Sequence, residues 1–239
     1  MSDPAEHFDD FWRASELGPL TVGRFAERLG RFDPAQPAVH PWQRTGPAHP
    51  LGHPRGRLTS LLRRRRSDRD LGAQPLRRGD LCALLGTLAR TDSGWGHPSA
   101  GDLRAVRASV ILWRTDHPLA GRVAQHDPER HTLTDVGPAP DWQAEHQALG
   151  GLDTTTPPAA AVVLLGDPTA VVEKYGERGG RFLLLEAGAA LQSLSLAAAE
   201  RRLPAYATGG AFDARLRAVC GHARTGALPL AVLLLGGRR

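Results

Sequence analysis

The chain has 239 residues, of which 41% are hydrophobic and 23% are charged, and these values fit one large or two small globular domains with a buried core. The two cysteines, Cys82 and Cys220, stand in apolar patterns, which argues against a disulfide scaffold and favours a reducing cytoplasm. No apolar run approaches the ~20 residues that span a bilayer, and the acidic, polar start does not resemble a signal peptide. We therefore expect a cytoplasmic protein without a membrane partner.

The formal charge of +5 reflects a bias in composition rather than a basic surface. Lys174 is the only lysine among the 30 basic residues, asparagine is absent, and Ile111 is the only isoleucine. Such a bias indicates a GC-rich genome and weakens the case for a nucleic-acid partner. A lysine kept where arginine is the default indicates a need for an amine that can lose its proton, with chance as the alternative. Lys174 is followed by Tyr175, one of two tyrosines.

The first part of the chain predicts an extension to a main domain. Residues 1–32 show the periodicity of two short amphipathic helices. From Asp33 to Pro54 six prolines exclude a helix or a central strand, so we expect an extended connector. His49 and His53 have a metal-like spacing, but the proline after each prevents the helix that would align them, and no metal site is expected. The predicted division is an N-terminal helical extension with a Pro-rich linker over 1–57 and a main domain over 58–239.

The main domain mixes helices and strands without a regular βαβ repeat. This mixture is typical of the α+β class, with one sheet packed against helices and no internal repeat. The helices follow from leucines at helical spacing, and the strands from short apolar runs. In chain order we expect helices over 58–66 and 81–88, a loop over 91–102, a strand over 110–113, a turn over 126–131 between two short strands, a strand over 160–165, helices over 168–175 and 182–201, a strand over 203–207, a helix over 212–220 and a strand over 230–235.

Three segments carry the candidate chemistry. The first is RRRRSDR at 63–69, whose guanidinium groups and hydroxyl suit a phosphate, with a solvated basic run or a nucleic-acid patch as the alternative. The second is PSAG at 98–101, where small residues let backbone N–H groups approach an anion or a flat ring, although alone it predicts only a turn. The third pairs EKYGER at 173–178 with TGGAFD at 208–213, whose glycines fit a backbone close to a planar cofactor.

In this order and spacing the segments resemble the nitroreductase-like flavin oxidoreductases. They are most similar to the SagB-type dehydrogenases, which oxidise azolines during thiazole and oxazole formation in ribosomal peptide natural products. That branch shares the arginine-serine start, the PSAG loop, a turn like residues 127–131 with Leu133 after it, a Lys-Tyr-Gly stretch, a long Ala-rich helix and a Gly-Gly-x-Phe-Asp segment. The resemblance covers residues 58–237, and the joint order is more specific than any single motif.

The resemblance implies an α+β, nitroreductase-like fold, with a central, mainly antiparallel sheet packed between helices, and a domain-entwined homodimer. It implies FMN as the cofactor. It also implies that Lys174 and Tyr175 are the catalytic pair, in agreement with the composition argument. In the cofactor site it places Arg65, Arg66, Ser67, Arg69 and Arg238 at the phosphate and ribityl chain, Gly209 and Gly210 against the isoalloxazine ring, and Pro98, Ser99, Ala100 and Gly101 at the flavin of the other subunit.

The implied reaction oxidises thiazoline or oxazoline rings of a peptide substrate to thiazole or oxazole, which removes a proton from Cα and a hydride from the β-carbon. Lys174, partly desolvated, serves as the base and Tyr175 relays the proton or orients the ring, and these roles could be exchanged. A cyclodehydratase or another peptide-modifying enzyme is the expected partner. Two alternatives stay open: an FMN-dependent NAD(P)H reductase of the nitroreductase type, and a catalytically idle FMN-binding subunit that scaffolds a peptide-modifying complex.

The chain departs from the SagB-type pattern at several positions. These differences leave the fold prediction intact and leave the substrate and the exact reaction open. The departures are Leu103-Arg104 in place of a Tyr-Pro pair after the PSAG loop, Gly180 in place of an aromatic residue, Glu186 in place of an aspartate, Ala189 in place of a histidine, and residues 123–126 in place of a Gly-x-Tyr-x-Tyr segment.

Overall fold

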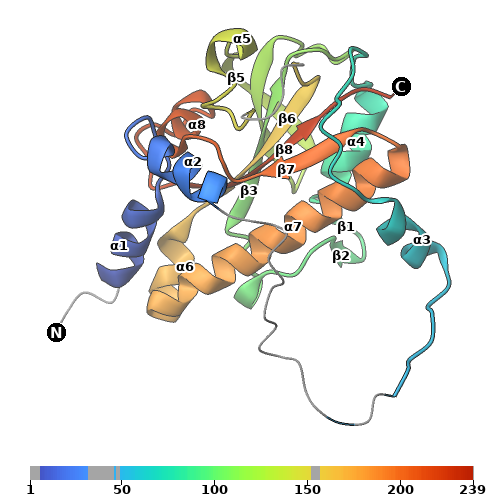
Figure 1. Cartoon of the computed structure of the whole chain (residues 1–239), viewed down its shortest axis with the longest axis horizontal. Helices are drawn as coiled ribbons and strands as arrows, with labels where there is room; N and C mark the ends of the chain where they lie inside the picture. Colours follow the sequence, from blue (N-terminus) through green and yellow to red (C-terminus); the bar gives the residue numbers. More distant parts are fainter. Residues whose placement is uncertain (1–5, 32–45, 47–48, 152–156, 239) are drawn as a thin grey trace.

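The computed structural model describes residues 6–31, 46, 49–151 and 157–238 (Figure 1). Its helices are α1 (Glu6–Ser15), α2 (Val22–Arg31), α3 (Arg57–Arg64), α4 (Arg78–Gly86), α5 (Trp142–Glu145), α6 (Pro168–Tyr175), α7 (Gly179–Arg201) and α8 (Asp213–Val219), with 3-10 turns η1 (Ala100–Asp102) and η2 (Gly176–Arg178). Its strands are β1 (Arg90–Thr91), β2 (Gly94–Trp95), β3 (Val106–Leu112), β4 (Arg122–Asp127), β5 (Thr132–Pro138), β6 (Ala160–Gly166), β7 (Ala205–Thr208) and β8 (Leu228–Leu235).

The longer strands form one antiparallel sheet in the order β5-β4-β3-β6-β8-β7. Every residue of β6 is buried, as expected for a short, continuous apolar run in the middle of a sheet. Val162 of β6 lies opposite Val110 of β3 on one side and opposite Leu233 of β8 on the other. β7 stands at the end of this order, pairs among the described strands only with β8, and so forms one edge of the sheet. The fold is therefore α+β, as the sequence predicts.

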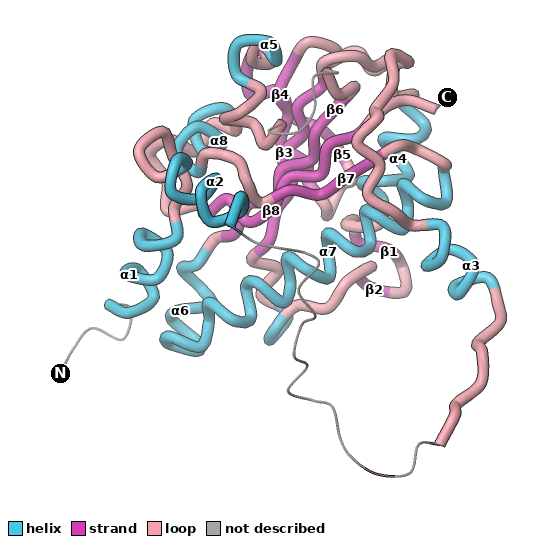
Figure 2. The backbone as a smooth tube through the Cα atoms, viewed as in Figure 1, coloured by secondary structure: helices cyan, strands magenta, loops and turns pink. Residues whose placement is uncertain are grey.

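Helices cover both faces of the sheet (Figure 2). On one face α4 and α7 contribute leucines and alanines to the core, among them Leu183 and Leu194, which are fully buried. On the other face α5 and α8 contribute Trp142 and Leu216. By length and composition, residues 168–201 could cross a membrane. Ten of the 23 residues of α7 are buried in the fold.

The observed elements follow the predicted order with small differences. The strand expected over 110–113 begins at Val106 and pairs with β6 along its whole length. The prediction missed the first residues of this strand because Arg107 interrupts the apolar run. The loop expected over 91–102 contains the hairpin β1–β2, whose two-residue strands are too short to show alternation. No periodic pattern marks α5, which has four residues. The predicted connector over 33–54 lies largely outside the described residues.

The N-terminal extension is attached to the main domain by α1 and the turn after it. Phe8 is only 5% exposed, and a Cβ added at Gly180 would come within 2.8 Å of its ring atom Cε2. Phe8 thus fills the space beside the position where the SagB-type pattern has an aromatic residue. After α1, the Leu17 N–H donates to the Asp213 carboxylate at 2.8 Å. The boundary between the extension and the main domain stays a prediction.

Candidate functional site

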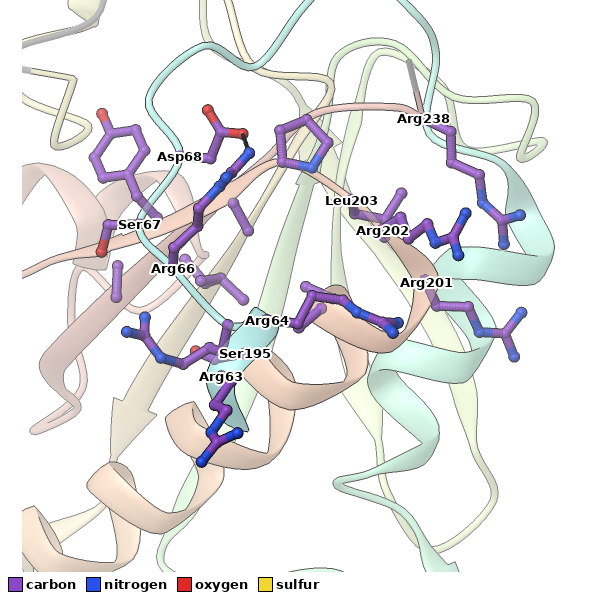
Figure 3. A pocket seen from close by; sticks show the side chains of 18 residues that line it. Arg63, Arg64, Arg66, Ser67, Asp68, Ser195, Arg201, Arg202, Leu203 and Arg238 are labelled. Carbon is purple, nitrogen blue, oxygen red and sulfur yellow. Dashed lines mark ion pairs between the residues drawn. The ribbon is translucent and has the colours of Figure 1, made fainter. Parts of the chain in front are cut away.

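A cavity of about 700 Å³ opens where the C-terminal ends of α3 and α7 meet the edge strand β7 and the C-terminal tail. This volume lies in the range of small-molecule binding sites. Most of the polar lining is arginine, and the arginines labelled in Figure 3 come from separate elements around the cavity. The arginines are Arg63, Arg64, Arg65, Arg66, Arg201, Arg202 and Arg238.

The end of α3 directs the arginine run into this cavity. The helix ends at Arg64, and the next residue, Arg65, has an extended ψ of 122°. The chain then follows the open edge of β7, where the Asp68 N–H donates to the Ala205 carbonyl at 2.9 Å. Arg66 pairs with the same Asp68 at 3.7 Å, drawn as a dashed line in Figure 3. Asp68 therefore holds the backbone of the segment through its N–H, and its carboxylate lies within ion-pair distance of the exposed Arg66.

Asp80, in the first turn of α4, holds two more of the arginines. Its side chain is 3% exposed, and its Oδ1 accepts from Arg238 at 2.5 Å and from Arg201 at 3.5 Å. A buried carboxylate is costly unless it is paired, and the first turn of a helix favours its negative charge. Asp80 therefore joins α4, the end of α7 and the C-terminal tail on one side of the cavity.

Two glycines let the C-terminal tail reach Asp80. A Cβ added at Gly236 would overlap the carbonyl of Leu71, and one at Gly237 would overlap the carbonyl of Pro75. Only glycine allows the backbone to pass this close to the segment that precedes α4. The close passage ends with Arg238 on the carboxylate of Asp80.

The charge around the cavity is strongly unbalanced. In the described part of the chain, Asp68 pairs with Arg66, and Asp80 pairs with Arg201 and Arg238. Two carboxylates against the seven arginines of the lining leave a formal surplus of five positive charges. The C-terminal ends of α3 and α7 also point here, and their partial negative charge favours nearby cations. The remaining surplus suits a phosphate or another polyanion, bound through charge-assisted hydrogen bonds.

The structure places four of the predicted phosphate ligands in the lining of this cavity. Arg69 does not line it, and its guanidinium lies 5.4 Å from the centroid of the Tyr206 ring. Because Tyr206 is itself a lining residue, Arg69 contacts a wall of the cavity rather than its interior. The four lining residues are Arg65, Arg66, Ser67 and Arg238.

The predicted glycine pair directly follows the edge strand that borders the cavity. Gly209 is exposed, and a Cβ added there would have no atom within 4 Å. The Gly210 N–H donates to Thr208 Oγ1 at 3.0 Å, which holds the turn after β7. Since residues 205–207 line the arginine cavity, the glycines continue the same edge beyond it. The open face at Gly209 leaves room for a planar group.

The predicted PSAG loop lies away from the arginine cavity and is held by a buried carboxylate of α7. Ser99 Oγ donates to Glu186 Oε2 at 2.5 Å and accepts from the Arg104 N–H at 2.9 Å. Glu186 is 3% exposed, and its other oxygen accepts from the Val106 N–H at 3.0 Å. Glu186 therefore fixes the loop to the start of β3.

Gly101 brings this loop against the predicted catalytic pair. Its φ is +59°, and an added Cβ would lie 2.5 Å from both Lys174 Nζ and the Tyr175 hydroxyl. Lys174 is exposed at the end of α6, with its Nζ 5.4 Å from the centroid of the Tyr175 ring. Tyr175 is half-buried and packs edge-on against Phe182 at 4.8 Å. The amine and the phenol thus meet at one point of the loop.

Gly101→Ala is expected to lower the free energy of unfolding by about 1 kcal/mol, because a non-glycine residue is strained at this φ. Urea denaturation measures the change. The matched control is Gly188→Ala, in the middle of α7, where an added Cβ has open space and helix propensity favours alanine. The control should keep or raise the stability. Equal effects of the two substitutions would contradict the argument.

The arginine cavity lies at the C-terminal end of α7, whereas the PSAG loop contacts the N-terminal half of this helix. Glu186 contacts the loop, Ser195 is the first residue of α7 in the cavity lining, and the helix between these two residues is about 14 Å long. A single chain therefore does not bring Lys174 and Tyr175 to the arginine cavity.

Several residues of these two groups have no role in the site that the sequence predicts. A buried aspartate in a leucine-rich helix, a glutamate in an alanine-rich one, and an arginine pair at the end of a long helix are signals that could identify them. The residues are Asp80, Glu186, Arg201 and Arg202.

Comparison with known proteins decides the family. The family model described as "Nitroreductase family" matches residues 62–237. The chain belongs to the nitroreductase family. Its members are oxidoreductases with FMN as the cofactor. A search of the curated proteins finds no significant match.

Solved structures share the nitroreductase fold. The Escherichia coli microcin synthetase McbBCD complex with truncated pro-MccB17 bound contains a chain that matches 99% of this chain over 93% of its own length, with a TM-score of 0.71 and 21% identity. A nitroreductase candidate from Anabaena variabilis matches 76% of this chain, which spans only 39% of that protein, with a TM-score of 0.64 and 23% identity. Nitroreductase A from Vibrio parahaemolyticus matches 75% of this chain over 67% of its own, with a TM-score of 0.52 and 15% identity.

The arginine cavity fits the cofactor of the nitroreductase family. The surplus of guanidinium groups is opposite in sign to the FMN phosphate and can bind it, and Ser67 adds a hydroxyl at the same wall. The exposed face of Gly209 lies farther along the same edge strand, where a flat ring can approach the backbone closely. Charge and shape thus agree with a ligand that is anionic at one end and planar at the other.

Proposed function

We propose that this nitroreductase-family protein is an FMN-dependent dehydrogenase that oxidises thiazoline or oxazoline rings of a ribosomally made peptide. The observation that carries the proposal is the close approach of Gly101 to Lys174 and Tyr175. The SagB-type resemblance assigns Lys174 and Tyr175 to azoline oxidation and the PSAG loop to the flavin. This close approach brings the pair and the loop together. The fold shared with a chain of the microcin synthetase complex, which holds a pro-peptide, supports a peptide substrate and a partner enzyme.

In this proposal Arg65, Arg66, Ser67 and Arg238 hold the FMN phosphate, and Gly209 and Gly210 flank the ring. Bound FMN supplies the two-electron acceptor for the hydride that leaves the azoline β-carbon. Asp80 positions Arg238, and Asp68 positions Arg66. Arg69 acts through its contact with Tyr206.

A second copy of the chain would complete the site. Because the PSAG loop contacts the N-terminal half of α7 and the arginine cavity lies at its C-terminal end, the loop of one subunit would serve the flavin held by the arginines of the other. Leu184 and Leu185 of α7 are 44% and 69% exposed and give this helix an apolar surface that a partner subunit could cover. We infer a homodimer with two equivalent sites.

The proton step falls to Lys174 and Tyr175. Aromatisation of an azoline requires a base that removes the Cα proton, and the Lys174 amine is a group that can accept it. The Tyr175 hydroxyl, which meets the amine at Gly101, orients the ring or relays the proton. In the single chain Lys174 is exposed, so a partner subunit or the substrate must exclude water from it.

The deciding experiment gives the FMN-loaded protein a thiazoline-containing peptide and oxygen and follows the peptide mass. Loss of two hydrogens per ring supports the proposal. Reduction of the flavin by NADPH, with turnover of a nitro compound or quinone and no azoline oxidation, would replace it with the NAD(P)H reductase function. Bound FMN without either activity would favour the scaffold function.

Arg65→Ala is expected to weaken FMN binding at least about tenfold, since one charge-assisted hydrogen bond contributes ~1.5–3 kcal/mol. Titration of the apoprotein, followed by flavin fluorescence, measures the dissociation constant. Arg90→Ala is the control, because Arg90 is an exposed arginine that pairs with Glu129 outside the cavity lining. The control should bind FMN as the wild type does. An unchanged dissociation constant in Arg65→Ala would refute the phosphate assignment.

A further inference from the structure

A second cavity, of about 280 Å³, lies between α4 and the turn that joins β4 to β5. Cys82 of α4 lines this cavity, and it follows by two residues Asp80, whose carboxylate pairs with Arg201 and Arg238 of the arginine cavity. Two residues rotate the helix by about 200°, so Cys82 and Asp80 point to opposite sides of α4. The walls of this second cavity combine leucines with one arginine, one cysteine and three histidines.

Three of these side chains form a relay. Cys82 Sγ lies 3.4 Å from His131 Nε2, and His131 Nδ1 lies 3.1 Å from His126 Nε2. Cys82 is exposed and forms the outer end of the relay, whereas His126 is 2% exposed and forms its inner end. The turn that presents His131 is fixed by Asp127, whose carboxylate accepts from the Glu129 N–H at 2.9 Å. A thiol, an imidazole and a buried orienting group thus stand in line.

The inner histidine is suited to orient the middle one without taking its proton. Burial and then the nearby His131 lower the pKa of His126 to about 4, so His126 is neutral at neutral pH. A neutral ring can hold His131 through a hydrogen bond, as an amide does in cysteine–histidine–asparagine sites. His131 then presents Nε2 to the thiol.

The cavity also offers a place for an anionic group beside the thiol. Arg78 lines it, and in the described residues its guanidinium has no ion-pair partner, while its backbone N–H donates to Asp116. The pKa of the neighbouring His117 is lowered, first by burial of its ring and second by the positive charge of Arg78. Leu85 and Leu133 supply an apolar surface for the body of a small ligand.

We propose that this second cavity is a thiol–disulfide exchange site in which Cys82 attacks small disulfides that carry a carboxylate. The Cys82 thiol gives its proton to His131 Nε2 while its sulfur bonds to one sulfur of the disulfide. The original S–S bond breaks, and the second sulfur leaves as a thiolate that recovers the proton. The products are a mixed disulfide on Cys82 and one small thiol, so electrons balance, and the same small thiol reverses the step.

The other cysteine is an internal control for this reactivity. Cys220 is 1% exposed, and burial raises the pKa of its thiol to about 12. It therefore stays a protonated, enclosed thiol at neutral pH, where disulfide exchange needs the accessible thiolate.

The test compares two disulfides with the same reacting bond and opposite charge, dithiodipropionate and cystamine, on the FMN-loaded full chain. Intact-protein mass spectrometry follows the rate of adduct formation. We expect one adduct on Cys82, none after Cys82→Ser, and a rate with dithiodipropionate at least about fivefold above that with cystamine. His131→Ala should slow both reactions at least about tenfold.

Arg78→Gln separates ligand binding from thiol activation. It should remove the preference for dithiodipropionate while the rate with cystamine does not fall. His131→Asn repeats the relay test with a smaller change if His131→Ala does not fold. Equal rates for the wild type and the folded His131 variant would overturn the proposal, as would a preference for cystamine or an adduct on Cys220. These outcomes do not depend on the azoline assay.

Discussion

Lys174→Arg is expected to lower azoline oxidation at least ~100-fold while the protein keeps its FMN. Arginine preserves the positive charge but does not release a proton near neutral pH, so the substitution separates a base from an electrostatic contact. A factor of about 100 is the lower end of what a positioned base contributes. Turnover of the thiazoline peptide and the flavin absorbance of the same sample give the two readouts.

Tyr175→Phe and Arg181→Lys are the comparisons for this result. Tyr175→Phe should lose less activity than Lys174→Arg if the phenol only orients the ring. Arg181 is an exposed arginine of α7, and its exchange for lysine should leave turnover unchanged. Full activity in Lys174→Arg would show that the amine is not the base and would favour the reductase or the scaffold function.

Acidification is expected to lower the free energy of unfolding by roughly 3 kcal/mol through His126 alone. The pKa of His126 is lowered to about 4 in the folded chain, whereas an unfolded histidine titrates near ~6.5. Below that value the unfolded chain takes up a proton that the folded chain does not. The contribution is therefore complete above about pH 6.5 and is lost as the pH falls to about 4.

Urea denaturation at several pH values between 7 and 4 measures this dependence. His126→Gln should make the fall with pH shallower, but not abolish it, because burial also lowers the pKa of His97 and of His117. His53→Gln is the control, since His53 is exposed and lies outside regular structure. If His126→Gln and His53→Gln gave the same slope as the wild type, the buried imidazole would not be the cause.

The fold is readily predicted where the pattern is local. The leucine and alanine periodicity of residues 182–201 and the apolar run at 160–165 correspond to α7 and β6, which form the centre of the core. The arginines of 63–66 are consecutive, so their charge is visible without a structure. A local pattern does not reveal that Arg201 and Arg238 join them, because Asp80 brings them together from far along the chain.

The candidate catalytic pair shows the same limit. Composition singles out Lys174, but its distance from the arginine cavity follows only from the length of α7. The replacement of an aspartate by Glu186 gives no hint that this side chain holds both Ser99 and the start of β3. Such contacts depend on which buried groups remain to be paired after the sheet and helices have packed.

The packing of Phe8 on Gly180 links two positions that are 172 residues apart. The space beside the start of α7 admits one aromatic ring, supplied here by the first helix rather than by α7 itself. An aromatic residue at position 180 would have to displace Phe8. A small residue at position 8 would leave a cavity unless a larger residue replaced Gly180. The two positions are therefore constrained to change together, so an insertion or loss of the first helix during evolution would be accompanied by a change at the start of the long helix.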